Sequence, residues 1–217
     1  MSAQSPLAPS TSTHSPLEPY NTSSDDWHIQ RARAVAPVLV DEAPQIESDR
    51  ALSARALTAM HDARLFRLSL PHEFGGAQCS PAQLAQVTET ISAADASAAW
   101  CLGQGLGCAM SAAFMDSEPA REVFGAHNSV LAWGAGNQGK AVLTDGGYRI
   151  TGTWQFASGG KHATWLGAHC KVFEADGVTP KLNAAGKHAV RTALLPRDQA
   201  DMADDWHVMG LRGTRSE

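Results

Sequence analysis

The stretch TGTWQFASGGKHATWLGA, residues 151–168, places three large aromatic side chains around a run of very small residues. Trp154, Phe156 and Trp165 flank the segment Ala157-Ser158-Gly159-Gly160. Flat side chains beside nearly bare backbone indicate a wall against which another flat group can lie. A hairpin inside a β core explains the same residues, so the rest of the chain has to separate the two interpretations.

The residues around this stretch follow a period of two. Over residues 148–158 the even positions are mostly aromatic or aliphatic and the odd positions mostly polar, which is typical of a half-buried strand. Asp145-Gly146-Gly147 is a hairpin turn signal, and TWLGAHCKVF (164–173) and HAVRTALL (188–195) indicate further strands. We therefore expect an antiparallel β domain, a barrel or sandwich, over residues 127–217.

Residues 27–126 follow a helical period instead, so the chain is expected to be of the α+β class with an all-α domain first. Ser53 is a suitable N-cap, and Ser80, Pro81 and Gln83 form the sequence of a capping box. The first helix is expected to start near Trp27 and to kink or break at Pro37 or Pro44.

A further predicted helix contains Gly103, Gly105 and Gly107. Each glycine costs about 1 kcal/mol relative to alanine in a helix interior. We expect a compensating reason for them, the close approach of another backbone.

Residues 1–26 contain seven serines, three threonines and four prolines. They have no apolar stretch of the kind found in a signal peptide, and the first Lys or Arg is Arg31. This composition predicts a disordered tail.

Bulk composition excludes several classes of protein. The net charge of -5 argues against nucleic-acid binding, and no apolar run approaches the roughly 18 residues that span a bilayer. Four cysteines without CxxC spacing predict reduced thiols in a cytoplasmic protein. Scattered histidines predict no metal site.

Gly134-Ala135-Gly136-Asn137-Gln138-Gly139 matches the dinucleotide fingerprint GxGxxG in its letters. That motif needs a helix directly after it, which receives the pyrophosphate. Here the following residues, KAVLTDGGYRITG, predict a strand, a turn and another strand. We therefore reject the Rossmann interpretation, and the glycines are left to serve close backbone approach to a ligand or a flexible connection.

Several stretches together resemble the acyl-CoA dehydrogenase superfamily. They are LFRLSLPHEFGGA (65–77), ADASAAW (94–100), GGYRITGTWQFASGGKHATW (146–165) and WHVMGLRGT (206–214). The WQFASG form is closest to the branch of two-component, flavin-dependent monooxygenases. The resemblance implies a helical N-terminal domain, a middle β domain and a C-terminal four-helix bundle, and the sequence is expected to lack that bundle and to end within the middle domain.

The resemblance also implies a cofactor, FAD or FMN, and residues that contact it. Phe156 matches a position beside the flavin ring, Ser158 matches a hydroxyl bonded to flavin N5, and Ala157 lies between them. Trp133 and Gly134 match a segment lining the flavin and substrate pocket. Trp100 is a candidate for the substrate pocket, with core packing equally open, whereas core packing is favoured for Trp154 and Trp165.

Two functions from different classes follow from the resemblance. The first is a flavin-dependent oxidoreductase that acts on an acyl-CoA or an aromatic substrate, with a flavin reductase as a possible partner and a homo-oligomer at full length. The catalytic base of the family would lie in the missing bundle, so the catalytic residues are unknown. The second is a truncated, non-catalytic remnant or binding module. Arg64 and Arg215 depart from the glycines usual in the family.

Overall fold

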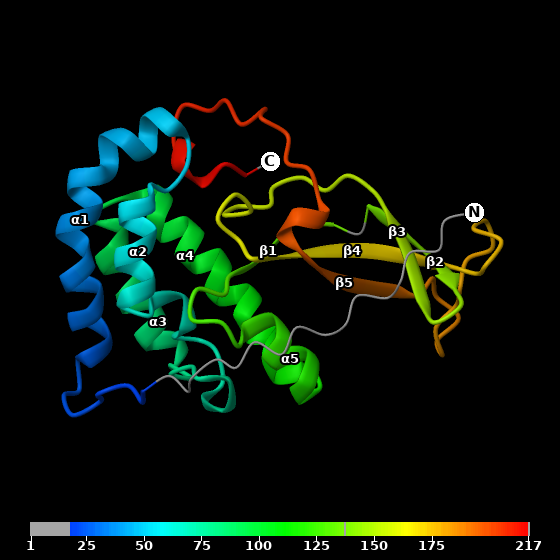
Figure 1. Ribbon diagram of the computed structural model, residues 1–217, viewed down its shortest axis with the longest axis horizontal. Coiled ribbons are helices and arrows are strands. Elements are labelled where there is room, and N and C mark those ends of the chain that lie inside the picture. Colours follow the sequence, from blue (N-terminus) through cyan, green and yellow to red (C-terminus); the bar gives the residue numbers. More distant parts are fainter. Residues whose placement is uncertain (1–17, 137, 217) are drawn as a thin grey trace, which may run out of the picture.

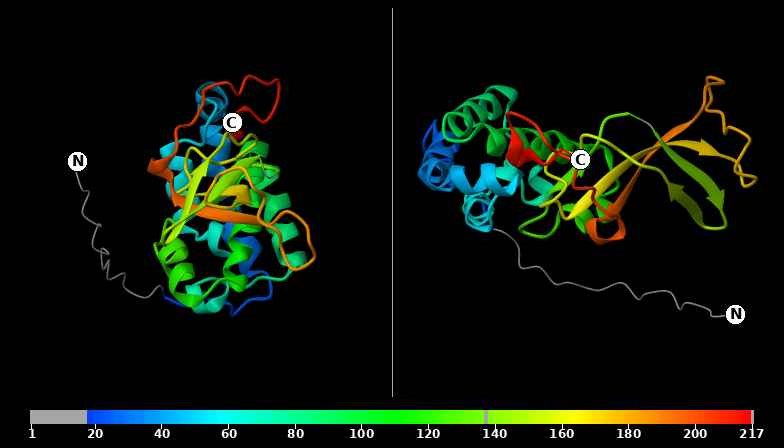
Figure 2. Two further views of the ribbon diagram at one scale, coloured as in Figure 1. Left: turned by 90° about the vertical axis from the view of Figure 1, so that its right-hand side faces the viewer. Right: turned by 90° about the horizontal axis from the view of Figure 1, so that it is seen from above.

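Helices lie at one end of the molecule, and a β-sheet projects from them (Figures 1 and 2). The computed structural model describes residues 18–136 and 138–216. The helices are α1 (Trp27–Asp49), α2 (Ala54–Asp62), η1 (Leu65–Arg67), η2 (His72–Phe74), α3 (Pro81–Ser92), α4 (Ala96–Ala109), η3 (Met110–Phe114), α5 (Ser117–Phe124), η4 (Arg197–Gln199) and η5 (Arg212–Thr214). The strands are β1 (Leu131–Trp133), β2 (Gly139–Thr144), β3 (Gly147–Thr151), β4 (Trp165–Phe173) and β5 (Val190–Pro196).

Local capping signals place the helix starts, as predicted. The Ser53 hydroxyl accepts a hydrogen bond from the Ala56 amide at 3.1 Å. Ser80 and Gln83 form the predicted capping box, with both reciprocal bonds present. The α1 helix runs through Pro37 and Pro44 without interruption, so the predicted break does not occur.

The prediction for the three glycines of α4 is wrong. Among the described residues, nothing would lie within 4 Å of a Cβ at Gly103 or Gly107. A Cβ at Gly105 would lie 3.0 Å from a ring carbon of Phe66. The nearest atoms at Gly105 therefore belong to the side chains of Phe66 and Val130, and no backbone atom of another segment is among them.

The sheet is mixed, so the predicted antiparallel barrel or sandwich is wrong. β4 is central. β1 pairs in parallel with the first part of β4, β2 pairs in parallel with its last part, and β5 pairs with it antiparallel. β2 and β3 form the predicted antiparallel hairpin. β2 begins at Gly139, the last glycine of the motif, so the described chain continues as a strand where the Rossmann interpretation needs a helix.

The predicted strand over residues 148–158 is only half correct. β3 ends at Thr151, and beyond it only Gln155 keeps a bridge, to Ala135. Phe156 has a φ of +63°, which is incompatible with a strand. The alternation of apolar and polar residues therefore continues past the point where the backbone leaves the sheet.

The main buried cluster joins the helices to the start of the sheet. Helical residues such as Leu39, Met60 and Leu102 share it with Val130 and Leu166. The proposed domain boundary at residues 126 and 127 stays a prediction. The helices before it end at Phe124, and the strands begin at Leu131.

The ends of the described chain both lie against the helices. Residues 1–17 of the predicted tail lie outside the described residues, and the disorder of residues 1–26 stays a prediction. The Tyr20 hydroxyl donates to the Arg64 carbonyl at 3.1 Å. The segment from residue 201 to 216 runs back from the sheet and places η5 against α1 and α4 (Figure 1). No helix among the described residues combines the length and apolar character needed to cross a membrane.

Candidate functional site

A cavity of about 420 Å³ lies where α4, the end of β1, the segment after β3 and the C-terminal segment meet. This size falls within the range of small-molecule sites, about 300–1,000 Å³. Its lining residues are Trp100, Gln104, Trp133, Gly134, Ala135, Phe156, Ser158, His169, Trp206, Leu211, Thr214 and Ser216. We call this space the aromatic cavity.

Four of the five predicted flavin contacts line the aromatic cavity, together with the candidate pocket residue Trp100. Ala157 does not line it. Ala157 lines a neighbouring cavity of about 960 Å³ on the sheet, which Trp133 and Gly134 also border. The structure thus brings Trp133, Gly134, Phe156 and Ser158 together from two separate stretches of sequence.

Phe156 combines backbone strain with exposure. Its φ is +63°, which is uncommon for a residue other than glycine. Its side chain remains 58% exposed and meets the Trp206 ring edge-on, with the centroids 6.3 Å apart. Strained residues persist where the surroundings dictate the conformation, and they concentrate at ligand sites.

Ser158 is buried beside this aromatic ring. Its Oγ accepts a hydrogen bond from Trp100 Nε1 at 2.9 Å. A second bond, 2.6 Å long, joins it to Ser216 Oγ. Trp100 therefore reaches the cavity through its indole nitrogen while 48% of the residue stays exposed, which disfavours core packing for this side chain.

Two glycines of the rejected dinucleotide motif, Gly134 and Gly139, allow close contacts within the chain. A Cβ at Gly134 would lie 2.2 Å from the Gln155 carbonyl oxygen. A Cβ at Gly139 would lie 2.2 Å from the Trp154 ring. Gly134 is thus needed to bring the end of β1 against the segment that carries Phe156.

The remaining tryptophans pack in the two faces of the sheet. Trp154 packs partly buried in the sheet cluster and donates from Nε1 to the His169 carbonyl at 2.9 Å. It also lines the larger cavity. Trp165 packs against the cluster around α5, in agreement with its predicted core role, and lines neither cavity.

His169, Gln104 and Trp206 were missed by sequence reasoning. His169 lies on β4 with its ring against Trp133, at a centroid distance of 5.3 Å. Its Nδ1 lies 2.7 Å from Thr192 Oγ1, and burial lowers the pKa of the ring. A lone histidine in a strand gives no signal of a pocket. Trp206 belongs to the quoted stretch WHVMGLRGT, so only a role for it was missing.

The arrangement suits a flat ligand more than it suits nucleophilic or metal chemistry. Among the described residues, the cavity lining contains aromatic rings and hydroxyls and no carboxylate. Burial raises the pKa of the Cys101 and Cys108 thiols to about 12, so they are not reactive thiolates near neutral pH. A flavin ring fits these features, because it needs an apolar wall and a few polar contacts at its edge.

The chain is similar to a known protein family and to flavin-dependent monooxygenases. Residues 30–134 match the family described as Acyl-CoA dehydrogenase, N-terminal domain. An indole-3-acetate monooxygenase of Pseudomonas putida is 32% identical over 173 residues, 79% of this chain and 42% of that protein. The oxygenase component of an FADH(2)-dependent resorcinol hydroxylase of Rhizobium sp. is 31% identical over 206 residues, 94% of this chain and 48% of that protein.

A solved structure gives the same result for the fold. XiaF from Streptomyces sp., in complex with FADH2 and glycerol, superposes with a TM-score of 0.80 at 27% sequence identity. The match covers 87% of this chain and 46% of that chain. The chain therefore spans less than half the length of each of these three proteins. The resemblance to the acyl-CoA dehydrogenase superfamily and its flavin-dependent monooxygenases is confirmed.

Proposed function

Since residues 30–134 belong to the acyl-CoA dehydrogenase N-terminal domain family, we propose that this chain forms the flavin-binding part of a flavin-dependent monooxygenase. FAD or FMN in reduced form is the cofactor, an aromatic compound is the substrate, and a flavin reductase is the partner. The relatives favour this reaction over acyl-CoA dehydrogenation because they are described as monooxygenases and hydroxylases.

Phe156 and Ser158 carry the proposal. Phe156 has a strained backbone and presents a half-exposed ring to the cavity. Ser158 holds a buried hydroxyl beside it. We place the flavin ring against Phe156, with Trp133, Gly134 and Ala157 as further contacts. The substrate lies on the side of Trp100.

The flavin, when bound, supplies the redox chemistry by which O₂ hydroxylates the substrate. The residues of this chain bind and orient it and keep water from its face. Burying an aromatic side chain contributes about 1.5–3 kcal/mol, whereas a neutral hydrogen bond contributes about 0.5–1.5 kcal/mol net. The affinity therefore depends mainly on the aromatic wall, and the hydroxyls orient the ring edge.

A visible absorption titration of the purified chain with FAD and FMN tests the proposal, in both oxidation states and under anaerobic conditions for the reduced one. We expect a saturable spectral shift in at least one state, and a weaker affinity in Phe156→Ala. Phe114→Ala is the matched control, because Phe114 is 91% exposed and lines neither cavity. A folded chain that binds neither flavin would overturn the proposal and favour a non-catalytic remnant or binding module.

We also propose that the full-length flavin-dependent monooxygenase assembles as a homo-oligomer. Phe114, Met110 and Met209 are large exposed apolar side chains on the described surface. Sedimentation of the purified chain, compared with that of a version extended to the length of its relatives, would test this.

A further inference from the structure

A continuous chain of hydrogen bonds runs from Trp100 through three hydroxyl groups to a backbone carbonyl. Trp100 Nε1 donates to Ser158 Oγ at 2.9 Å, and Ser158 Oγ lies 2.6 Å from Ser216 Oγ. Ser216 Oγ lies 2.8 Å from Thr214 Oγ1. Thr214 Oγ1 donates to the Leu211 carbonyl oxygen at 2.9 Å. All five residues line the aromatic cavity.

The groups at the two ends of this hydroxyl chain, the Trp100 indole and the Leu211 carbonyl, determine which hydroxyl donates to which. An indole nitrogen can only donate a hydrogen bond and a carbonyl oxygen can only accept one, whereas each hydroxyl carries one hydrogen. If Thr214 gives its hydrogen to Leu211, then Ser216 gives its hydrogen to Thr214, and Ser158 gives its own to Ser216. Every hydroxyl hydrogen then has a protein acceptor.

The reverse direction is less favourable without a ligand. The Ser158 hydrogen would then have no protein acceptor among the hydrogen bonds of the described residues, and the bond from Thr214 to Leu211 would be lost. An unmade hydrogen bond of a buried group costs more than a made one contributes. The forward direction leaves Ser158 with one lone pair free and no hydrogen free.

We propose that Trp100, Ser216 and Thr214 are positioning residues that hold the Ser158 hydroxyl as an acceptor toward the aromatic cavity. This inference rests on the proposed flavin site. A ligand that presents an N–H at Ser158 binds without any change in the direction of these hydrogen bonds. A ligand that presents a bare nitrogen binds only after the Ser158 hydroxyl turns its hydrogen away from Ser216, which costs at least one hydrogen bond among the three hydroxyls.

In the proposed site, flavin N5 is the atom that meets the Ser158 hydroxyl. N5 carries a hydrogen only in the reduced ring and is a bare nitrogen in the oxidised ring. The hydroxyl chain therefore favours the reduced state. The difference amounts to about one net hydrogen bond, 0.5–1.5 kcal/mol, or about tenfold in relative affinity at the upper end. Ser216 and Thr214 set this preference through the hydroxyl of Ser158.

The variant Ser216→Ala tests the inference by freeing the Ser158 hydrogen. The measurements are the dissociation constants of reduced and oxidised FMN and FAD, and the midpoint potential of the bound flavin. We expect the ratio of the two affinities to shift about tenfold toward the oxidised state. For a two-electron couple this lowers the midpoint potential by about 30 mV.

Two further variants separate this role from a structural one. Ser216→Thr keeps the hydroxyl and should retain the ratio of the original chain. Ser111→Ala removes a hydroxyl that bonds the Cys108 carbonyl, away from the cavity, and should change nothing. If Ser216→Ala binds flavin with an unchanged affinity ratio and potential, the inference is overturned and the proposed function stands. If none of these proteins binds flavin in either state, both are overturned.

Discussion

The helices and the wall of the aromatic cavity are held in different ways. The helices begin at capping residues such as Ser53 and Ser80 and close over fully buried side chains such as Leu102. The cavity wall consists largely of irregular segments, residues 152–164 and 201–216, which hydrogen bonds tie to distant parts of the chain. We therefore expect stability to reside mainly in the first region and the proposed flavin binding mainly in the second.

The largest effect we predict tests this separation directly. Leu102→Ala in α4 should lower the free energy of unfolding by about 2–5 kcal/mol, because it leaves a cavity in the main core. Phe156→Ala should change it by less than about 0.5 kcal/mol, since that side chain is largely exposed and its backbone is strained. Urea denaturation measures both. Equal losses in the two variants would contradict the separation.

The helices were predictable because their signals are local. A capping box spans four residues, and an apolar stripe repeats every three or four, so both can be read within one segment. The same holds for the tight turn between β2 and β3, where Gly146 has a φ of +81°. The family resemblance added the four residues of the cavity wall, Trp133, Gly134, Phe156 and Ser158, which no local signal brings together.

The sheet was mispredicted because its pairing is not local. Consecutive strands suggested hairpins, yet β1 and β2 both pair in parallel with β4, more than 20 residues further along. After β3, the only bridge of the segment that carries Phe156 joins Gln155 to Ala135, which lies before β2 in the described chain. Ser216 was not predicted for the same reason: its role depends on its contact with Ser158, which is far from it in the sequence.

The two departures from the family have a shared backbone explanation. Arg64 and Arg215 have φ angles of +57° and +39°, a region that glycine adopts without cost. Arg64 gains a ring contact with Tyr20 in return. Arg215 gains an ion pair with Asp204 at 3.2 Å.

The junction between the two regions should weaken in acid. His162 packs its ring against Phe66, and its Nε2 is buried with no hydrogen-bond partner among the described residues. Burial, and then the neighbouring His61, lowers the pKa of His162 from 6.5 to about 4. His61 is lowered to about 4 as well, by burial and then by His127.

The sign of the effect follows from proton uptake. Between pH 6.5 and about 4 the unfolded chain protonates His162 while the folded chain does not, so stability falls as the pH falls through this window. The shift of His162 corresponds to about 3 kcal/mol at most. His162→Leu should make the pH dependence of thermal unfolding shallower in this window. An equally steep dependence in His162→Leu would contradict the assignment.

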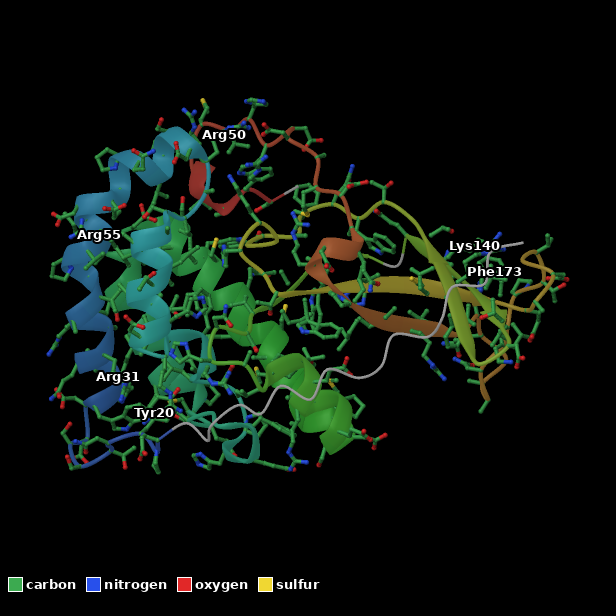
Figure 3. The ribbon with its side chains drawn as sticks, in the orientation of Figure 1. Tyr20, Arg31, Arg50, Arg55, Lys140 and Phe173 are labelled. Carbon is green, nitrogen blue, oxygen red and sulfur yellow. The ribbon has the colours of Figure 1, made fainter. Side chains whose placement is uncertain are left out.

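The N-terminal segment should behave as part of the helical region. Arg64 lies over the Tyr20 ring at 3.8 Å and Arg31 lies over it at 4.8 Å, at the opposite end of α1 from Arg50 (Figure 3). Tyr20→Ala should lower the free energy of unfolding by about 1–2 kcal/mol, through lost cation–π contacts and packing. Tyr20→Phe keeps the ring and should cost about half as much. A loss below 0.5 kcal/mol in Tyr20→Ala, on the order of an ordinary surface substitution, would mean that the segment does not stabilise the helices.

The smallest predicted effect on stability lies at the other end of the chain. Asp204 pairs with Arg50 at 2.5 Å and with Arg215 at 3.2 Å, but its side chain is 58% exposed. Exposed ion pairs contribute about 0.2–1 kcal/mol and weaken with salt. Asp204→Asn should therefore hardly change the unfolding transition.

The same substitution should still affect the cavity, because Trp206, Leu211 and Ser216 line it from the segment that Asp204 anchors. We expect a faster release of bound flavin from Asp204→Asn at low ionic strength, and a difference that shrinks as salt is raised. Asp176→Asn is the matched control, since among the described residues Asp176 accepts hydrogen bonds only within its own turn, from Val178 and Thr179. Release rates that do not depend on Asp204 at any salt concentration would show that its ion pairs do not hold the C-terminal wall in place.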